Sequence, residues 1–174
     1  MTAKPLILMD LDNTLLDFDR QEAAAISAML RERGIAPTDE VLSAFRRINV
    51  RHWEMLENGE LTRRQVLVGR FEVLFKELGV ALDAQSAEDS YASHLCEGYY
   101  FVPGALKLLE TLHGRCAMYI ISNGNARVQD ARLASSGISK YFEKIFISEN
   151  MTPPARLSSA TVLHLTYAAG AMPG

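Results

Sequence analysis

The sequence predicts an α/β fold in which a parallel sheet is interrupted by an inserted helical segment. Three short apolar runs, at 6–9, 117–121 and 145–147, have the length and composition of buried strands. Helical patterns separate these runs, and the order strand, helix, strand implies parallel pairing with right-handed crossovers. Residues 17–100 contain helical patterns and no convincing strand. We therefore expect a three-layer core that carries an all-helical cap.

The first strand is expected over Leu6–Met9, directly before Asp10, as a strand buried on both faces. In the helix that follows, Asp19 and Glu22 have the spacing of a capping box. Gly34 is expected to end that helix, because glycine readily adopts the left-handed conformation found after helix ends.

Three more helices are expected in the inserted segment. The first is opened by Pro37–Glu40 and ends at Asn58–Gly59. Thr62–Gln65 has the pattern of a capping box for the next helix, which stops at Gly79. The last one is expected over Gln85–Cys96.

After the insertion the pattern returns to alternating helices and strands. Pro103–Gly104 begins a short helix that leads to the strand at 117–121. The leucines of this helix that we expect to point inward are Leu108, Leu109 and Leu112. A helix over 126–135 follows and is stopped by Gly137, and the third strand is expected at 145–147.

These elements divide the chain into a core at 1–16 and 101–149, a cap at 17–100 and a divergent tail at 150–174. The tail contains no Asp, Glu or Lys. Pro153–Pro154 breaks any helix at its start. The apolar stretch Ser158–Ala171 fits a helix and a strand equally well, so the tail predicts no defined element.

Composition and charge exclude several classes of protein. The length of 174 residues suits one globular domain, or one domain with a small insertion. The composition, 48% hydrophobic and 22% charged, excludes a disordered chain or a coiled-coil rod. The net charge of -3 leaves no basic surplus to neutralise nucleic-acid phosphates, so we expect no nucleic-acid partner. A local site can still bind one small phosphate.

The sequence predicts no membrane segment. The longest uninterrupted apolar stretch is Cys116–Ile121, whereas a spanning helix needs about 20 residues. The first residues also lack the apolar run of about 7–15 residues that a signal peptide needs. Cys96 and Cys116 match no metal-binding spacing and suit reduced thiols. We therefore expect a cytoplasmic protein.

Two carboxylates follow the first predicted strand, in the motif Asp10-Leu-Asp-Asn-Thr-Leu15. The carboxyl ends of parallel strands border the crevice in which open α/β sheets bind ligands. There Asp10 can attack a phosphoryl group, and Asp12 can protonate the leaving oxygen. Two carboxylates and a phosphate dianion repel one another, so this chemistry needs a divalent cation, and oxygen ligands favour Mg²⁺. The structural alternative is a helix N-cap or an Asx-turn after a strand.

The second predicted strand ends in Ser122-Asn123-Gly124. A hydroxyl and backbone N–H groups between a strand and a helix can bind an anion. The alternative is an ordinary strand-to-helix turn, because Ser, Asn and Gly are all common turn residues.

Together the two motifs resemble those of the haloacid dehalogenase superfamily of phosphohydrolases, whose core is Rossmann-like. The resemblance covers about residues 5–149 and includes the downstream run 129–137. The helical insertion is similar to the superfamily's helical cap. Within the superfamily, 49–53, 58–62 and 69–71 resemble the cytosolic pyrimidine 5′-nucleotidase type.

The resemblance implies a role for each motif residue. Asp10 would be the nucleophile and a metal ligand, and Asp12 the general acid/base, with its backbone carbonyl on Mg²⁺. Ser122 would bind the phosphate, together with the Asn123 backbone N–H. Thr14 would stabilise the turn after the strand. Asp12 argues against a dehalogenase, because that reaction has no leaving alcohol to protonate.

The implied activity is Mg²⁺-dependent hydrolysis of a small phosphorylated metabolite, specifically a nucleoside 5′-monophosphate. A sugar-phosphate phosphatase or phosphomutase would carry the same motifs. One of the residues Arg51, His52 and Trp53 can face the base of the substrate, and the favoured alternative is that they pack within the cap or lie exposed on its surface. Exposed core surface would also permit a homo-oligomer.

The chain departs from the superfamily pattern after Glu149. The third motif supplies a Lys and the fourth supplies acidic metal ligands, but residues 150–174 contain no Lys, Asp or Glu. Activity of this chain is therefore in doubt, and a catalytically silent fragment is the competing hypothesis. The abrupt change favours an altered or prematurely ended reading frame, and a natural short form is the alternative.

Overall fold

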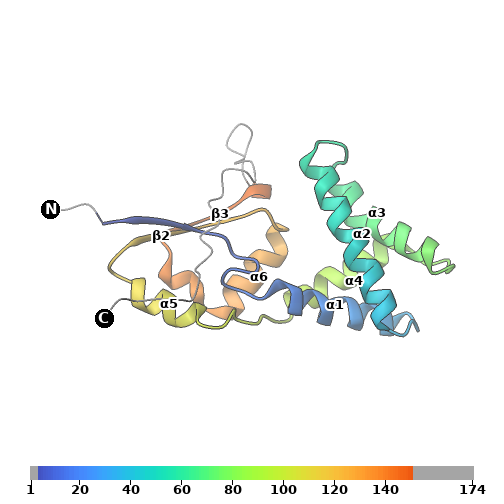
Figure 1. Ribbon diagram of the computed structural model, residues 1–174, viewed down its shortest axis with the longest axis horizontal. Helices are drawn as coiled ribbons and strands as arrows, with labels where there is room; N and C mark the ends of the chain where they lie inside the picture. Colours follow the sequence, from blue (N-terminus) through green and yellow to red (C-terminus); the bar gives the residue numbers. More distant parts are fainter. Residues whose placement is uncertain (1–3, 151–174) are drawn as a thin grey trace.

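The computed structural model describes residues 4–150, and it confirms the predicted α/β class. Its sheet has three parallel strands in the order β1-β2-β3 (Figure 1). The strands are β1 (Leu6–Met9), β2 (Ala117–Ser122) and β3 (Lys144–Ile147). The pairing aligns Met9 with Ile120 and Ser122 with Ile147, so the carboxyl ends of the three strands meet at one edge.

Two helices connect the strands and cover one face of the sheet. They are α5 (Ala105–Leu112) before β2 and α6 (Ala126–Ser136) before β3. Both connections step in the same direction across the sheet, and right-handed crossovers then place both helices on the same face. The core between them contains Met9, Met118, Ile120, Leu109 and Leu133.

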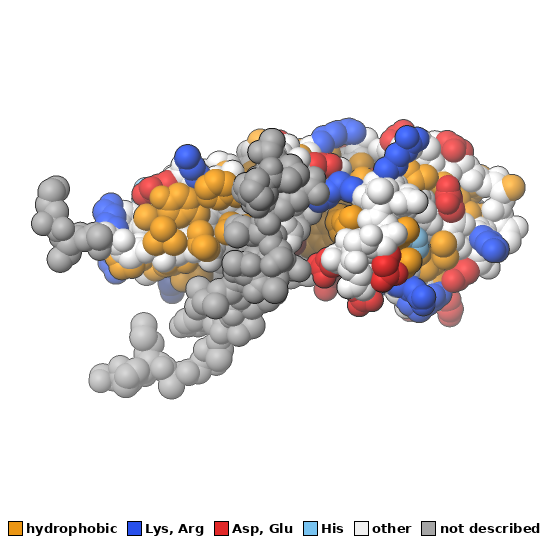
Figure 2. All heavy atoms as spheres, turned by 90° about the horizontal axis from the view of Figure 1, so that it is seen from above, with side chains coloured by type: hydrophobic (Ala, Val, Ile, Leu, Met, Phe, Trp, Pro, Cys, Tyr) orange, Lys and Arg blue, Asp and Glu red, His pale blue; other side chains and the backbone are white. Residues whose placement is uncertain are grey.

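The opposite sheet face carries exposed apolar side chains in the described residues. Leu6 is 62% exposed and Leu8 is 42% exposed, so the expectation that the first strand is buried on both faces is wrong. Hydrophobic side chains gather over this part of the molecule in Figure 2. In the described sheet β1 is an edge strand, so Asp10 and Asp12 follow an edge strand.

In α5 the expected inward position of Leu108 is also wrong, because Leu108 is 41% exposed. Ala105 and Leu109 are buried and Leu112 packs against the core, which is the stripe of positions i, i+4 and i+7. Leu108 lies beside this stripe because one residue turns the helix by about 100°.

Four helices form the segment between β1 and α5. They are α1 (Phe18–Glu32), α2 (Asp39–Glu57), α3 (Arg63–Glu77) and α4 (Ala84–Cys96). Within 17–100, all of which the structure describes, no residue is in a strand. Figure 1 shows these helices beside the sheet, at the end where the strands terminate.

The helix ends follow the sequence signals with one exception. Thr38 caps α2, and Thr62 with Gln65 forms the expected capping box of α3. The expected box of Asp19 and Glu22 is wrong, because Asp17 caps α1 by accepting from the Arg20 N–H at 3.0 Å. The helix α1 therefore begins earlier than a cap at Asp19 would place it. Glu22 faces the interior of the helical bundle.

An aromatic cluster holds three of the four helices together. Phe71 is fully buried, with ring centroids 5.5 Å from Phe45, 5.6 Å from Tyr91 and 6.2 Å from Phe75. These rings come from α2, α3 and α4, so they fix the relative positions of three helices. Such pairs add about 0.5–1.5 kcal/mol each beyond the apolar area that they bury.

In the described part of the chain no helix is both long and apolar enough to cross a bilayer. Cys96 and Cys116 are free thiols. The predicted tail at 150–174 lies outside the described residues, apart from Asn150.

A pH-sensitive contact joins α1 to α4. His94 lies 2.9 Å from the Glu97 carboxylate and 2.6 Å from the Glu32 carboxylate. The hydrogen bond to Glu97, reinforced by Glu32, raises the pKa of His94 above its usual value. Because the folded pKa exceeds the unfolded value of about 6.5, the stabilisation is fully present below that pH and disappears as the pH rises through the folded pKa.

We expect the melting temperature to fall by about 1–3 °C between pH 6 and pH 8.5 through this contact, since exposed ion pairs are screened by solvent. In His94→Gln this component disappears. Thermal unfolding followed by circular dichroism checks the expectation, and His113→Gln serves as the matched control. An unchanged pH dependence in His94→Gln would remove His94 as its source.

Candidate active site

The loop after β1 holds two carboxylates at the edge of the sheet. Leu11 is fully buried, and its carbonyl accepts from the N–H groups of Leu15 and Leu16, both at 3.0 Å. These contacts curl the chain into a compact turn. Asp10 and Asp12, on either side of the anchored leucine, both line a cavity next to the sheet.

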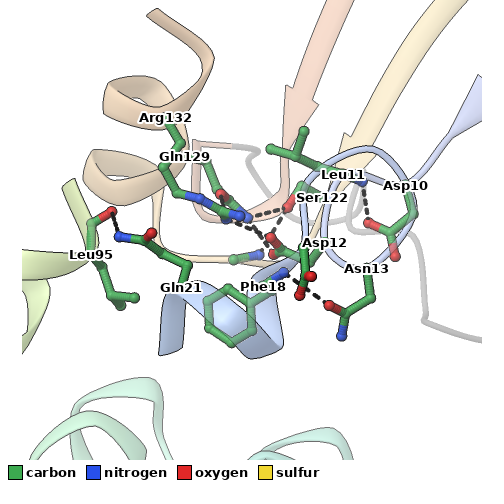
Figure 3. Close-up of polar contacts among 12 residues, drawn as sticks. Asp10, Leu11, Asp12, Asn13, Phe18, Gln21, Leu95, Ser122, Gln129 and Arg132 are labelled. Atoms are coloured by element: carbon green, nitrogen blue, oxygen red, sulfur yellow. Dashed lines mark hydrogen bonds and ion pairs between the residues drawn. The ribbon is translucent and has the colours of Figure 1, made fainter. Parts of the chain in front are cut away.

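Asn13 joins this loop to α1. It adopts the left-handed conformation with φ 56°, which Asn tolerates better than most residues. Its Oδ1 accepts from the backbone N–H of Phe18 at 2.9 Å (Figure 3) and from that of Asp19 at 3.2 Å. The Thr14 side chain makes no hydrogen bond within the described chain. Asn13 thus makes the turn contacts that the sequence led us to expect of Thr14.

The structure brings Asp12 and Ser122 together through Gln129. The Gln129 Nε2 donates to Asp12 Oδ2 at 2.5 Å and to Ser122 Oγ at 2.9 Å (Figure 3). Because both oxygens contact one nitrogen, the acid motif after β1 and the hydroxyl motif after β2 belong to one site.

Arg132 places a buried positive charge beside this site. Its Nη1 donates to Asp12 Oδ1 at 2.5 Å and to Gln129 Oε1 at 2.8 Å. The side chain is fully buried, and its guanidinium lies 5.4 Å from the Phe18 ring. Both carboxylate oxygens of Asp12 therefore accept hydrogen bonds from α6.

Sequence reasoning assigned no role to Gln129 or Arg132. They are three residues apart on α6, so they lie on the same side of the helix, close to Val128 and Leu133, which are buried. Two long polar residues on the inner side of a helix directly after a predicted phosphate loop indicate a polar contact with that loop.

Ser122 has an available hydrogen-bond donor. It is 1% exposed, and its Oγ accepts from the Gly124 N–H at 3.2 Å as well as from Gln129. The hydroxyl hydrogen can then point toward an anion. Asn123 is exposed, and its carbonyl accepts from Arg63 at 3.0 Å, so a helix of the inserted segment contacts the loop directly.

Glu149 caps the helix that follows Ser122. Its Oε2 accepts from the Ala126 N–H at 2.6 Å, at the first turn of α6, and its Oε1 lies 3.9 Å from Arg63 Nε. A carboxylate is favourable at a helix N-terminus, where unpaired N–H groups carry partial positive charge.

Two oxygen donors of the loop suit a magnesium ion. The Asp10 carboxylate and the Asp12 backbone carbonyl are hard ligands, and Mg²⁺ is commonly bound by one or two protein groups while it keeps several waters. In the described residues no group of three or more His, Cys, Asp and Glu could hold a metal. The loop thus fits Mg²⁺ through few protein ligands.

A cavity of about 360 Å³ lies between the sheet edge and the helical bundle. On the sheet side it is lined by Asp10, Asp12, Asn123, Gly124 and Gln129. On the helical side the lining includes Trp53, Arg70, Glu88, Tyr91 and Leu95. Of the three residues 51–53, Trp53 faces this cavity. The Nδ1 of His52 lies 2.8 Å from the Ile48 carbonyl oxygen, and Arg51 is exposed.

Gly124 is required by the packing of Gln129. A Cβ built on Gly124 would overlap the Gln129 Nε2 and lie 2.8 Å from its Cδ. Gly124→Ala should therefore push Gln129 away from Asp12 and Ser122. Loss of these hydrogen bonds, one of them to a carboxylate, should lower the free energy of unfolding by about 1–3 kcal/mol.

Urea unfolding measures this change, and the shift of the Gln129 side-chain amide signals in the NMR spectrum reports the displacement. Gly98→Ala is the matched control, because its Cβ would lie at an ordinary 3.6 Å from Gln21. Equal stability of the two variants, with an unmoved Gln129, would contradict this account of the loop.

A sequence model of the family described as haloacid dehalogenase-like hydrolase matches residues 4–165. The chain is 35% identical over 144 residues to the HAD-hydrolase YfnB of Bacillus subtilis, covering 83% of this chain and 61% of the relative. It is 34% identical over 146 residues to the pyrimidine 5′-nucleotidase PynA of Streptococcus pneumoniae, covering 83% of this chain and 62% of the relative.

The fold is similar to a solved structure as well. The crystal structure of YfnB from Bacillus subtilis bound to magnesium matches with a TM-score of 0.80 and 34% identity, over 85% of this chain and 65% of that one. The chain thus spans about three-fifths of the length of the curated relatives that it matches.

Proposed function

The chain belongs to the haloacid dehalogenase-like hydrolase family, and from this premise we propose that its site hydrolyses phosphomonoesters through an aspartyl phosphate. The observation that supports this most is that Asp10 and Asp12 line one cavity, while Gln129, which lines it as well, donates to both Asp12 and Ser122. A nucleophile, an acid/base and a phosphate-binding hydroxyl are the groups that a phosphoryl transfer of this type needs.

In the proposed reaction an oxygen of Asp10 attacks phosphorus, and the bond from phosphorus to the leaving oxygen breaks. Asp12 gives its proton to that oxygen, which leaves as an alcohol. A water molecule then attacks phosphorus and loses a proton to Asp12, which releases inorganic phosphate and restores Asp10. Ser122 donates to the phosphoryl oxygens throughout.

A magnesium ion is the proposed cofactor. When bound, it would neutralise charge between the carboxylates and the phosphate dianion. Asp10 and the Asp12 carbonyl would hold it. The YfnB structure bound to magnesium supports this choice for a similar chain.

The proposed substrate is a nucleoside 5′-monophosphate. The similarity to the pyrimidine 5′-nucleotidase PynA supports it, as does a cavity volume near the lower end of the range for small-molecule sites, about 300–1,000 Å³. A sugar-phosphate phosphatase or phosphomutase and a catalytically silent chain are the alternatives. The division into core and cap, and a place in the cytoplasm, remain predictions.

Phosphate release from a panel of nucleoside monophosphates and sugar phosphates, with Mg²⁺ and long incubation, tests the proposal. We expect slow release that is fastest with nucleoside monophosphates and is lost in Asp10→Asn and in excess EDTA. Preferential release from sugar phosphates would favour the phosphatase or phosphomutase alternative. Release that persists in Asp10→Asn would overturn the mechanism.

A further inference from the structure

A fully buried arginine lies behind the acid/base of the proposed reaction. Arg132 comes from α6, and the described carboxylate that it pairs with is that of Asp12. Asp12 lines the cavity beside the sheet, whereas Arg132 is not among the described residues that line it. Any influence of Arg132 on a reaction in that cavity must therefore pass through the residues that it binds.

Packing alone does not account for a charged residue at this position. The Nε and Nη2 groups of Arg132 are buried and have no hydrogen-bond partner in the described residues. Unpaired N–H groups of a buried charge are costly, and the Phe18 ring at 5.4 Å compensates that cost only in part. An apolar side chain of similar length would fill the same space without the cost. The hydrogen bonds of Nη1 are therefore what an arginine supplies here.

Arg132 also decides which way the amide of Gln129 points. A guanidinium has only donors, so the Gln129 atom 2.8 Å from Arg132 Nη1 must be the carbonyl oxygen. The amide nitrogen is then directed to Asp12 Oδ2 and Ser122 Oγ (Figure 3). One buried cation thus supplies a direct contact to Asp12 and orients the residue that makes the second contact.

The two contacts hold both oxygens of the Asp12 carboxylate. Oδ1 accepts from Arg132 and Oδ2 accepts from Gln129, each at 2.5 Å, so a rotation of the carboxylate would break at least one hydrogen bond. Each carboxylate oxygen has a second lone pair. Because the Asp12 side chain is 26% exposed and lines the cavity, a lone pair remains for the proton that the proposed reaction transfers.

We propose that Arg132 is a positioning residue, which acts through Asp12 and Gln129 to hold the acid/base carboxylate toward the leaving oxygen of the substrate. The inference rests on the proposed function and adds to it a residue outside the cavity. Misplacing a catalytic group by about 1 Å can cost about 10² in rate. The loss should fall on the step in which Asp12 gives its proton to the leaving oxygen.

Two esters of similar size separate positioning from a general loss of structure. Benzyl phosphate has a poor leaving group that needs a proton, whereas 4-nitrophenyl phosphate has a good leaving group that does not. Phosphate release from both is measured with Mg²⁺ in the full chain and in Arg132→Met, Arg132→Lys and Arg127→Met. Arg127→Met is the matched control, because Arg127 is an exposed arginine of the same helix.

The comparison uses kcat/KM, which covers the steps up to departure of the leaving group and excludes the later attack of water. In Arg132→Met we expect kcat/KM to fall about 10²-fold for benzyl phosphate and less than about threefold for 4-nitrophenyl phosphate. Arg132→Lys, which keeps one charged donor group, should recover about tenfold of the loss. Arg127→Met should change neither ester.

Urea unfolding of the same variants measures stability. The unfolding midpoint of Arg132→Met should not fall, because an apolar side chain replaces a buried charge with unpaired N–H groups and Asp12 is open to water. A lower midpoint with equal losses for both esters would overturn the positioning role and make Arg132 a structural residue. Unchanged rates for both esters would overturn it as well. If Arg132→Met does not fold, the ratio of the two losses in Arg132→Lys decides.

A second measurement does not require turnover. The side-chain amide signals of Gln129 in the NMR spectrum should shift in Arg132→Met and stay in place in Arg127→Met. Unmoved signals in Arg132→Met would overturn the claim that Arg132 orients Gln129.

Failure of the proposed function itself has a different signature. The parent chain would then release no phosphate from 4-nitrophenyl phosphate, or Asp10→Asn would release it as fast as the parent. The role of Arg132 in proton transfer falls with that result, whereas the Gln129 signals still decide whether Arg132 orients the amide.

Discussion

The 174-residue chain is expected to hydrolyse nucleoside monophosphates at least 10²–10³-fold more slowly than the usual enzyme median of about 10 s⁻¹. Phosphoryl transfer depends almost wholly on positioning and electrostatic stabilisation. The family resemblance implies a Lys and further acidic metal ligands, and residues 150–174 contain none of these residue types. Loss of a single stabilising group of this kind typically costs about 10²–10³ in rate.

Two arginines beside the site are held by other residues of the chain, so we expect neither to replace that Lys. Arg132 is fully buried and bound to Asp12 and Gln129, and Arg63 donates to the Asn123 carbonyl. Both therefore have structural partners. Initial-rate assays with CMP and Mg²⁺ measure the effect, with Asp10→Asn as the blank. A turnover number near 10 s⁻¹ that disappears in Asp10→Asn would show that the described residues and the tail suffice for catalysis.

Phe71→Ala is expected to lower the free energy of unfolding by about 3–5 kcal/mol. Phe71 is fully buried and contacts three other rings, from α2, α3 and α4. Its removal leaves a cavity in the middle of the helical bundle, and the surrounding helices can close that cavity only in part. The Arg70 guanidinium, 5.3 Å from the Phe71 ring, also loses a favourable contact.

Urea unfolding monitored by circular dichroism checks this value. Val73→Ala, on the same helix but 37% exposed, is the control and should cost less than about 1 kcal/mol. A loss for Phe71→Ala as small as that of the control would mean that α2, α3 and α4 are not held together by the aromatic cluster.

Signals that act over a few residues predicted the fold well. The strands near 6–9, 117–121 and 145–147 are confirmed, and so are the Thr62–Gln65 capping box and the helix end at Gly79. Each of these depends on local geometry: an apolar run, a side chain that reaches a nearby N–H, or a glycine with positive φ. Such preferences can be read from neighbouring residues alone.

Features that depend on distant partners were not predicted. One face of β1 is exposed because the crossover helices cover only the other side of the sheet. The helix α1 starts early because Asn13 accepts hydrogen bonds from the first two N–H groups of that helix. Gln129 and Arg132 escaped notice because their partner, Asp12, lies more than 100 residues earlier in the chain.

The central claim is that Asp10 accepts a phosphoryl group, and one measurement tests it without requiring turnover. Beryllium fluoride binds an aspartate oxygen as a stable analogue of the phosphoryl group, and ¹⁹F NMR detects the bound form. With Mg²⁺ and beryllium fluoride at millimolar concentration, the account predicts a bound ¹⁹F signal that is retained in Asp12→Asn and lost in Asp10→Asn. A bound signal that persists unchanged in Asp10→Asn, or the absence of any Mg²⁺-dependent signal in the parent chain, would contradict the account.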